Sequence, residues 1–284
     1  MPRRVPAPAL VLSAAVSVQA GAAVAKSMFG EIGPPGVVFL RLFFGGAALW
    51  LLQRPSVRRR APGSLRLAVL LGLVLVCMNL AFWESLDRVP LGVAVTVEFL
   101  GPLGLAVATS RRRFDLLWIV LAGAGVALLA RGGGSVEPLG IGLAAVAGFF
   151  WAVYIVVGTK VGRVWTGASG LAIAMPVACA VSLPWGAVSG GSNFFDPALL
   201  AEGAAVGILS SALPWSLEIE AMRRLPTHVF GVLMSLEPGV AALAGLVFLG
   251  EHLRGRQIVA IVLVVLASAG AARRAPEPEV PPDA

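Results

Sequence analysis

Long apolar runs, separated by short charged or Gly/Pro-rich stretches, fill almost the whole chain. Runs of this length and low charge are typical of helices that cross a bilayer, each of which needs ~20 residues. The pattern predicts an all-α membrane protein with ten membrane-spanning helices, of which the fifth and the tenth are short for a full span. The ten predicted helices cover residues 9–29, 36–52, 67–85, 91–109, 116–130, 139–157, 168–188, 203–220, 229–249 and 258–272.

Composition limits the classes of function open to the chain. Hydrophobic residues make up 58% and charged residues 13%, whereas soluble domains average about 25% charged residues. Ten helices use nearly all of the 284 residues, which leaves no room for a soluble catalytic or DNA-binding domain. The sequence has no zincin, G-x-S-x-G or P-loop motif, so we expect neither an enzyme nor an ATP-driven pump, and neither a cofactor nor a metal site.

The net charge of +7 is explained by topology rather than by a nucleic-acid partner. With the N-terminus in the cytoplasm, sixteen of the 22 Lys and Arg residues fall in cytoplasmic segments and four on the opposite side. This bias follows the positive-inside rule and predicts that both termini are cytoplasmic. The acidic, Pro-rich tail 276–284 is expected to be disordered. The four residues on the opposite side are Arg88, Arg131, Arg254 and Arg256.

An internal repeat divides the predicted helices into two groups of five. Residues Glu84–Pro90 read ESLDRVP, and residues Glu220–Pro226 read EAMRRLP, 136 positions later. We interpret 1–134 and 135–275 as two repeats. Because each has an odd number of spans, the second enters the membrane in the opposite orientation, an arrangement typical of secondary transporters with a substrate site near the midplane. A channel or a non-transporting scaffold is the alternative from a different class.

Two carboxyl groups lie deep inside predicted helices. With a rise of about 1.5 Å per residue, Glu98 is roughly 10 Å from the outer end of its helix and Glu237 roughly 12 Å from the inner end of its own. Ionisable groups at this depth are costly and are functional candidates. Burial favours a neutral carboxyl, so each residue is a candidate for proton coupling or substrate binding. The alternative is a structural carboxyl bonded to backbone groups that the kink-forming Pro102 and Pro238 leave free.

Five further residues are candidates for the lining of a polar cavity. Arg41 lies about five residues inside the second helix, where its fork of donors suits either a substrate carboxylate or a structural salt bridge to a neighbouring carboxylate. Gln19, Asn79, Tyr154 and Trp215 are polar or amphipathic groups inside helices of both halves. Each has a second interpretation as an interhelical hydrogen bond or packing residue.

Other conspicuous residues are interpreted as structural. Tryptophans near helix ends are typical of the aromatic belts that anchor a protein at the membrane surface. Two prolines without counterparts in the other half, Pro176 and Pro214, are interpreted as ordinary transmembrane prolines. The belt tryptophans are Trp50, Trp83, Trp118, Trp165 and Trp185.

The segment Ser211–Glu251 contains ALPWSLE, RLPTHVFG, MSLEP and FLGE, and the first half contains VPLGVAVTVEFLGPL. These motifs resemble the EamA-type transporters of the drug/metabolite transporter superfamily, and within it the threonine/homoserine exporters. The resemblance implies ten helices in inverted repeats, amino-acid export in exchange for protons, and functional roles for Glu98 and Glu237. Because one fold serves many substrates, export of another metabolite or drug, such as an aromatic amino acid, a purine or a hydrophobic cation, is the alternative.

Overall fold

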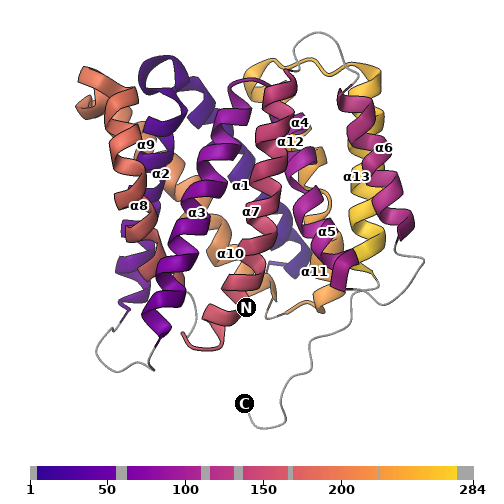
Figure 1. The fold of residues 1–284 in the computed structure, drawn as a ribbon, viewed down its shortest axis with the longest axis horizontal. Coiled ribbons are helices and arrows are strands. Elements are labelled where there is room, and N and C mark those ends of the chain that lie inside the picture. The colour runs from indigo at the N-terminus through magenta and orange to yellow at the C-terminus, as the bar shows by residue number, and fades with distance from the viewer. Residues whose placement is uncertain are drawn as a thin grey trace.

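The computed structural model describes residues 5–55, 63–109, 116–130, 137–165, 169–222 and 224–273, and within these ranges all regular structure is helical. The helices lie side by side in one bundle (Figure 1). We call the end at which α1 begins and α13 ends the lower end, as it is drawn in Figure 1, and the opposite end the upper end. The predicted disordered tail 276–284 lies outside the described residues.

Each predicted apolar segment is occupied by one helix or by two or three consecutive helices. Those before residue 131 are α1 (Ala7–Ser27), α2 (Phe29–Gln53), α3 (Ser64–Leu86), α4 (Leu91–Glu98), α5 (Leu100–Thr109) and α6 (Leu116–Ala130). The later ones are α7 (Pro138–Gly162), α8 (Ser169–Gly190), the 3-10 helix η2 (Gly191–Phe195), α9 (Pro197–Gly207), the π-helical turn η3 (Ile208–Ala212), α10 (Leu213–Met222), α11 (Thr227–Met234), α12 (Glu237–Leu249) and α13 (Gly255–Ala272).

Nine of these segments in the described chain are long and apolar enough to cross a membrane. The α4–α5, α8–η2, α9–α10 and α11–α12 pairs each count as one such segment. α6 is apolar throughout but has only 15 residues. Large apolar side chains project from the outside of the bundle, for example Leu51 (71% exposed) and Val247 (71% exposed). This surface suits lipid rather than water, so the chain is a multi-pass membrane protein.

α2 begins at Phe29, seven residues before the predicted start at 36. Residues 30–35, which include Gly33-Pro34-Pro35, lie between two predicted helices, but α2 runs through them with a kink at Gly33, whose φ is +64°. A positive φ is easily adopted by glycine. The Ile32 carbonyl at the kink accepts a hydrogen bond from Ser189 Oγ of α8 at 2.8 Å, so a neighbouring helix satisfies the interrupted backbone.

Two of the membrane segments are broken in the middle. The break between α4 and α5 lies at Phe99, and the break between α11 and α12 lies at Ser235 and Leu236. Pro102 and Pro238 follow these breaks and lie in the first turns of α5 and α12. At this position the missing N–H of a proline removes no helical hydrogen bond. The breaks therefore set the functional candidates Glu98 and Glu237 at helix ends inside the bundle.

The most extensive helix contacts join α2 to α8, α3 to α7, and α6 to α13. Small residues allow close approach where helices cross, as is common in membranes. At the crossing of α5 and α7, a Cβ on Gly101 would collide with the backbone carbonyl of Gly148. α6 and α13 pack together at one side of the bundle (Figure 1), which leaves the other helices to surround the interior.

Candidate functional site

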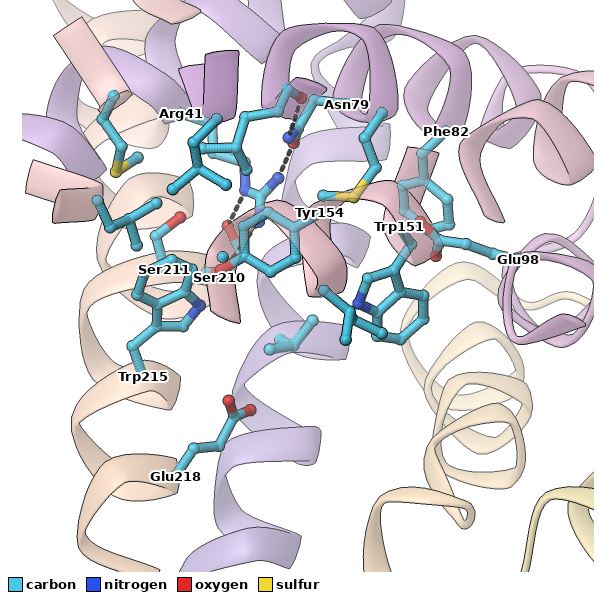
Figure 2. A pocket seen from close by; sticks show the side chains of 18 of the residues that line it. Arg41, Asn79, Phe82, Glu98, Trp151, Tyr154, Ser210, Ser211, Trp215 and Glu218 are labelled. Atoms are coloured by element: carbon cyan, nitrogen blue, oxygen red, sulfur yellow. Dashed lines mark hydrogen bonds between the residues drawn. The ribbon is translucent and has the colours of Figure 1, made fainter. Parts of the chain in front are cut away.

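A cavity of about 630 Å³ lies inside the bundle. Its wall comes from α1, α2, α3, α4, α7, α8, α10, α11 and α12, together with η3 and Phe99, and no lining residue comes from α6 or α13. Pockets of about 300–1,000 Å³ are typical of small-molecule sites. The cavity is mostly apolar, with a few polar and charged groups that point into it (Figure 2).

All seven residues that the sequence nominated for substrate or proton binding line this cavity, whereas the two prolines do not. Each is contributed by a different helix, seven in all, so the fold collects residues up to 218 positions apart. The seven are Gln19, Arg41, Asn79, Glu98, Tyr154, Trp215 and Glu237.

Arg41 is held by neutral acceptors. Its Nε donates to Ser210 Oγ at 2.8 Å, one terminal nitrogen donates to the Ser210 carbonyl at 3.0 Å, and the other donates to Asn79 Oδ1. Figure 2 shows the guanidinium between these two partners. Its carbon lies 5.6 Å from the ring centroid of Trp83, a cation–π distance. The sequence left open a salt bridge from Arg41 to a neighbouring carboxylate. Among the described residues, Arg41 forms no such bridge.

Two of the three acceptors for Arg41, both on Ser210, come from the irregular turn η3. Pro214 follows this turn and has no N–H to donate to the helical carbonyls before it. Two of those carbonyls accept side-chain donors instead: Ser17 Oγ donates to the Leu209 carbonyl at 2.7 Å, and Arg41 donates to the Ser210 carbonyl. Single π-helical turns are frequent at functional sites. Pro214 therefore helps to form the site, although its sequence context did not distinguish it from an ordinary transmembrane proline.

Glu98 and Glu237 face the cavity from the two helix breaks and are 9% and 8% exposed. Glu237 is the first residue of α12, where the positive end of the helix dipole stabilises a negative charge. Glu98 is the last residue of α4, where the dipole has the opposite sign. Gln19 Nε2 donates to Glu237 Oε1 at 3.3 Å. Within the described chain, the Glu98 carboxyl accepts no hydrogen bond from protein, so it is free for a ligand.

Sequence reasoning missed several residues of the wall. Glu218, Ser210 and Ser211 line the cavity, but nothing in their sequence context distinguished them. Glu218 lies within two residues of the end of the predicted span 203–220, and serines are common in membrane helices. Its carboxyl points into the cavity below Trp215 (Figure 2). The cavity therefore contains a third carboxyl group.

The prediction that Trp83 and Trp165 anchor the protein at the membrane surface is wrong. They are only 1% and 2% exposed. Trp83 lines the cavity and donates from Nε1 to Asn79 Oδ1 at 3.4 Å, and Trp165 donates from Nε1 to the Ser64 carbonyl at 3.2 Å. Both residues lie near helix ends that other segments cover, which a single sequence does not reveal. Trp50 and Trp185 are 48% and 55% exposed, as an anchor should be.

The cavity reaches one end of the bundle but not the other. Toward the lower end its wall includes Gly162 at the end of α7, Gly170 at the start of α8, and Met222, the last residue of α10, which is 51% exposed. Toward the upper end it stops at Trp83. The ring of Phe29, at the corner between α1 and α2, packs edge-on against Trp83 with centroids 6.1 Å apart. The cavity is thus accessible from below and closed above.

The described residues contain no group of three or more His, Cys, Asp or Glu side chains arranged to hold a metal ion. The polar atoms of the cavity instead suit an organic ligand with charges of both signs. A guanidinium lies on one part of the wall, and three carboxyl groups lie on others, with aromatic rings between them.

Comparisons with known proteins identify the class to which this arrangement belongs. The EamA-like transporter family matches residues 138–273. The threonine/homoserine exporter RhtA of Salmonella typhimurium (strain LT2) is 44% identical over 278 residues, which covers 95% of this chain and 94% of that protein. The exporter of the same name from Escherichia coli (strain K12) is 42% identical over 265 residues, which covers 92% and 89%.

The chain belongs to the EamA-like transporter family. Membership makes it a transporter rather than an enzyme, and a membrane-embedded one that acts on a small molecule. A solved crystal structure has the same fold, with a TM-score of 0.64 and 21% identity over 94% of this chain and 96% of that one. The EamA-like match begins at the first residue of α7 and extends just past the end of α13.

Proposed function

We propose that this EamA-like protein exports threonine, homoserine or a closely related small neutral amino acid across the cytoplasmic membrane in exchange for protons. The observation that carries the proposal is the identity of 42–44%, over nearly the full length, with exporters named for these two substrates. The chemistry of the cavity supports it independently, because an amino acid is a zwitterion that needs partners of both signs.

Arg41 is the proposed partner of the substrate carboxylate. A guanidinium has five N–H donors in a rigid fork that matches a carboxylate. Three of them are bound by Asn79 and Ser210, which fixes the plane of the group and leaves the remaining donors for a ligand. The rigid cation is thus oriented before the substrate arrives, which reduces the entropy lost on binding.

Glu98 and Glu237 are the proposed partners of the substrate ammonium group and of the transported proton. A carboxyl can exchange an ammonium partner for a proton without leaving an uncompensated buried charge. Glu98 suits proton binding, because it lies at the negative end of α4 and accepts no hydrogen bond from the described protein. Glu237 suits ammonium binding, because Gln19 and the start of α12 both stabilise its charge. Gln19, Asn79, Tyr154 and Trp215 complete the wall around the substrate.

We further propose the architecture of ten spans in two inverted five-helix repeats, 1–134 and 135–275. The pattern of contacts supports it: α2 packs on α8 and α6 on α13, and α3 packs along α7 as α1 packs along α9 and α10. The breaks at Phe99 and Ser235 are 136 residues apart, the spacing of the sequence repeat. The family match, which covers α7 to α13, is the length of one such unit.

The lower end is the proposed cytoplasmic side, with both termini there. Described basic residues are more numerous at the lower helix ends than at the upper ones, as the positive-inside rule requires. The cavity, accessible from below, would then be in the state that takes up substrate for export. The lower ends carry Arg54, Arg66, Lys160, Arg163, Arg224 and Arg273, and the upper ends carry Lys26, Arg88, Arg254 and Arg256.

The test is efflux of labelled threonine and homoserine from loaded vesicles that contain the purified protein, with and without an imposed pH gradient. We expect the gradient to accelerate efflux, and Glu98→Gln and Glu237→Gln each to abolish that acceleration. Glu137→Gln, at an exposed position before α7, is the matched control and should transport normally. Equal flux with and without the gradient would refute proton coupling, and absence of efflux of both amino acids would refute the substrate.

A wider or different substrate range is the second candidate, which the aromatic part of the wall favours. Trp151 packs edge-on against Phe99 with centroids 4.9 Å apart, and both line the cavity. Flat apolar surfaces of this kind suit aromatic amino acids, purines or hydrophobic cations. Competition of threonine efflux by a panel of such solutes separates the candidates. Inhibition by a purine but not by homoserine would favour the second.

A further inference from the structure

An ion pair at the upper end joins three segments that are distant in the sequence. Lys26, near the end of α1, has its Nζ 2.7 Å from Oε1 of Glu251. Glu251 lies in the connection between α12 and α13, and its second oxygen accepts the backbone N–H of Leu91 at 2.8 Å. Lys26 also donates to the Val89 carbonyl at 3.2 Å. The two charged side chains are 23% and 14% exposed, so both are partly removed from solvent.

The cluster caps the start of α4. Leu91 is the first residue of this helix, and its N–H has no partner within the helix, so Glu251 supplies one and also stabilises the positive end of the dipole. Glu98 is the last residue of the same helix and faces the cavity. At about 1.5 Å per residue, the eight residues of α4 form a rigid rod roughly 12 Å long between the ion pair and the cavity carboxyl.

The ion pair lies at the closed end of the cavity. The wall of the cavity stops at Trp83, below the corner between α1 and α2, whereas it extends to Gly162 and Met222 at the lower end. Lys26 and Lys160 are the only lysines in the chain, and each is near the end of the first helix of its half. Lys160 is exposed and pairs with no carboxylate of the described chain. An ion pair thus bridges different helices at the closed end. No such bridging pair is present at the open end among the described residues.

We propose that Lys26 and Glu251 are positioning residues that hold the upper exit closed while the cavity is open below. The pair must separate for the cavity to open above, and the separation moves the start of α4, and with it Glu98. The inference rests on the proposed exporter function, since it assigns the pair to one of the two states of a transport cycle. Separation exposes both charges to water at the upper surface, which compensates the lost attraction.

The experiment measures access to the cavity from the upper side. Val95 lines the cavity one turn below Leu91 and is 3% exposed. Val95→Cys, in a chain with Cys77→Ala and Cys179→Ala, is labelled with a membrane-impermeant thiol reagent added to the upper side of sealed, oriented vesicles. We expect Lys26→Gln and Glu251→Gln to increase the labelling rate at least tenfold. Lys26→Arg keeps the positive charge, so its labelling rate should stay near the rate of the Val95→Cys protein that has both Lys26 and Glu251.

A second ion pair at the same end of the bundle gives the matched control. Arg88 and Glu84 approach to 2.7 Å but belong to one helical turn at the end of α3 and bridge no helices. Arg88→Gln should leave labelling of Val95→Cys unchanged. Unchanged labelling in both Lys26→Gln and Glu251→Gln, for protein that elutes as a single folded species, would overturn the proposal that this pair holds the upper exit closed. Labelling does not depend on substrate. A failed threonine assay with increased labelling would therefore refute the proposed substrate but would still support the role of the Lys26–Glu251 pair in closing the upper exit.

Discussion

Gln19 and Glu237 are 218 residues apart in the sequence, yet the amide of one donates to the carboxyl of the other at 3.3 Å inside the bundle. The bond joins the part of α1 that lines the cavity to the first residue of α12, and Gln19 itself is 2% exposed. The neutral amide of Gln19 restricts the orientation of the Glu237 carboxyl without adding a second charge to the cavity.

Replacement of Gln19 by leucine should therefore slow transport. The substitution keeps the volume and removes the donor, which costs about 1.5–3 kcal/mol for a hydrogen bond to a charged group. This corresponds to a decrease of roughly 10- to 100-fold in the initial rate of threonine efflux. Gln53→Leu, at the exposed end of α2, is the matched control and should not change the rate. A normal rate for Gln19→Leu would show that Glu237 does not need this partner.

Arg41→Lys should fail to replace arginine although it keeps the charge. An ammonium group has no fork and cannot bind Asn79 and both acceptors of Ser210 in one plane. We expect the half-saturating threonine concentration to rise at least tenfold, with the protein still folded in detergent. The measurement is initial flux against substrate concentration. An unchanged half-saturating concentration would indicate that Arg41 acts only as a structural residue.

Glu218→Gln should weaken the capture of substrate from the lower side. Glu218 lies one turn below Trp215 in the wall, between the midplane carboxyls and the open end of the cavity. Loss of its charge removes an attraction for the substrate ammonium group, so we expect a higher half-saturating concentration at an unchanged maximal rate. Glu202→Gln, exposed on α9, is the control. A loss of maximal rate would instead place Glu218 in the proton-coupling step.

Gly101→Ala should destabilise the fold at the crossing of α5 and α7. The added Cβ would overlap the Gly148 carbonyl, and a backbone atom cannot move aside as the tip of a side chain can. Overpacking of this kind costs about 1–3 kcal/mol, which a lower unfolding temperature in detergent would report. Gly104→Ala, one turn later in α5, meets nothing within 4 Å and should leave the unfolding temperature unchanged or slightly higher.

The sequence predicted the helical segments well, because their apolar runs are long and separated by charges. The prediction was less successful where contacts with neighbouring segments determine the local backbone structure or the burial of a residue. The predicted helices leave out residues 30–35, which include Pro34 and Pro35, but α8 satisfies the interrupted backbone there and α2 runs through them. Trp83 has the position of a surface anchor in its own helix, but Phe29 covers it.

The residues of the site were predictable when their chemistry was unusual for their depth. Glu98, Glu237 and Arg41 are conspicuous because charge inside a membrane helix is costly. Their partners were not predictable. Ser210 becomes an acceptor for Arg41 through the local backbone geometry at η3, and Glu218 faces the cavity because of how α10 is rotated, neither of which is visible in residue type.

The turn η3 also makes the site dependent on the number of residues in this segment. An α-helix turns about 100° with each residue, and η3 holds its five residues in wider, π-helical geometry directly before Trp215 and Glu218. A π-helical turn holds about one residue more than an α-helical turn, so deletion of one residue between Ile208 and Ala212 would let the helix close into regular α geometry while the rest of α10 keeps its orientation. The oxygens of Leu209 and Ser210 would then be displaced from Ser17 and Arg41, although Trp215 and Glu218 stay in the wall. The number of residues in η3 therefore matters to the site as much as their identity does. Substitutions keep that number constant, so mutagenesis by substitution alone would not reveal its importance.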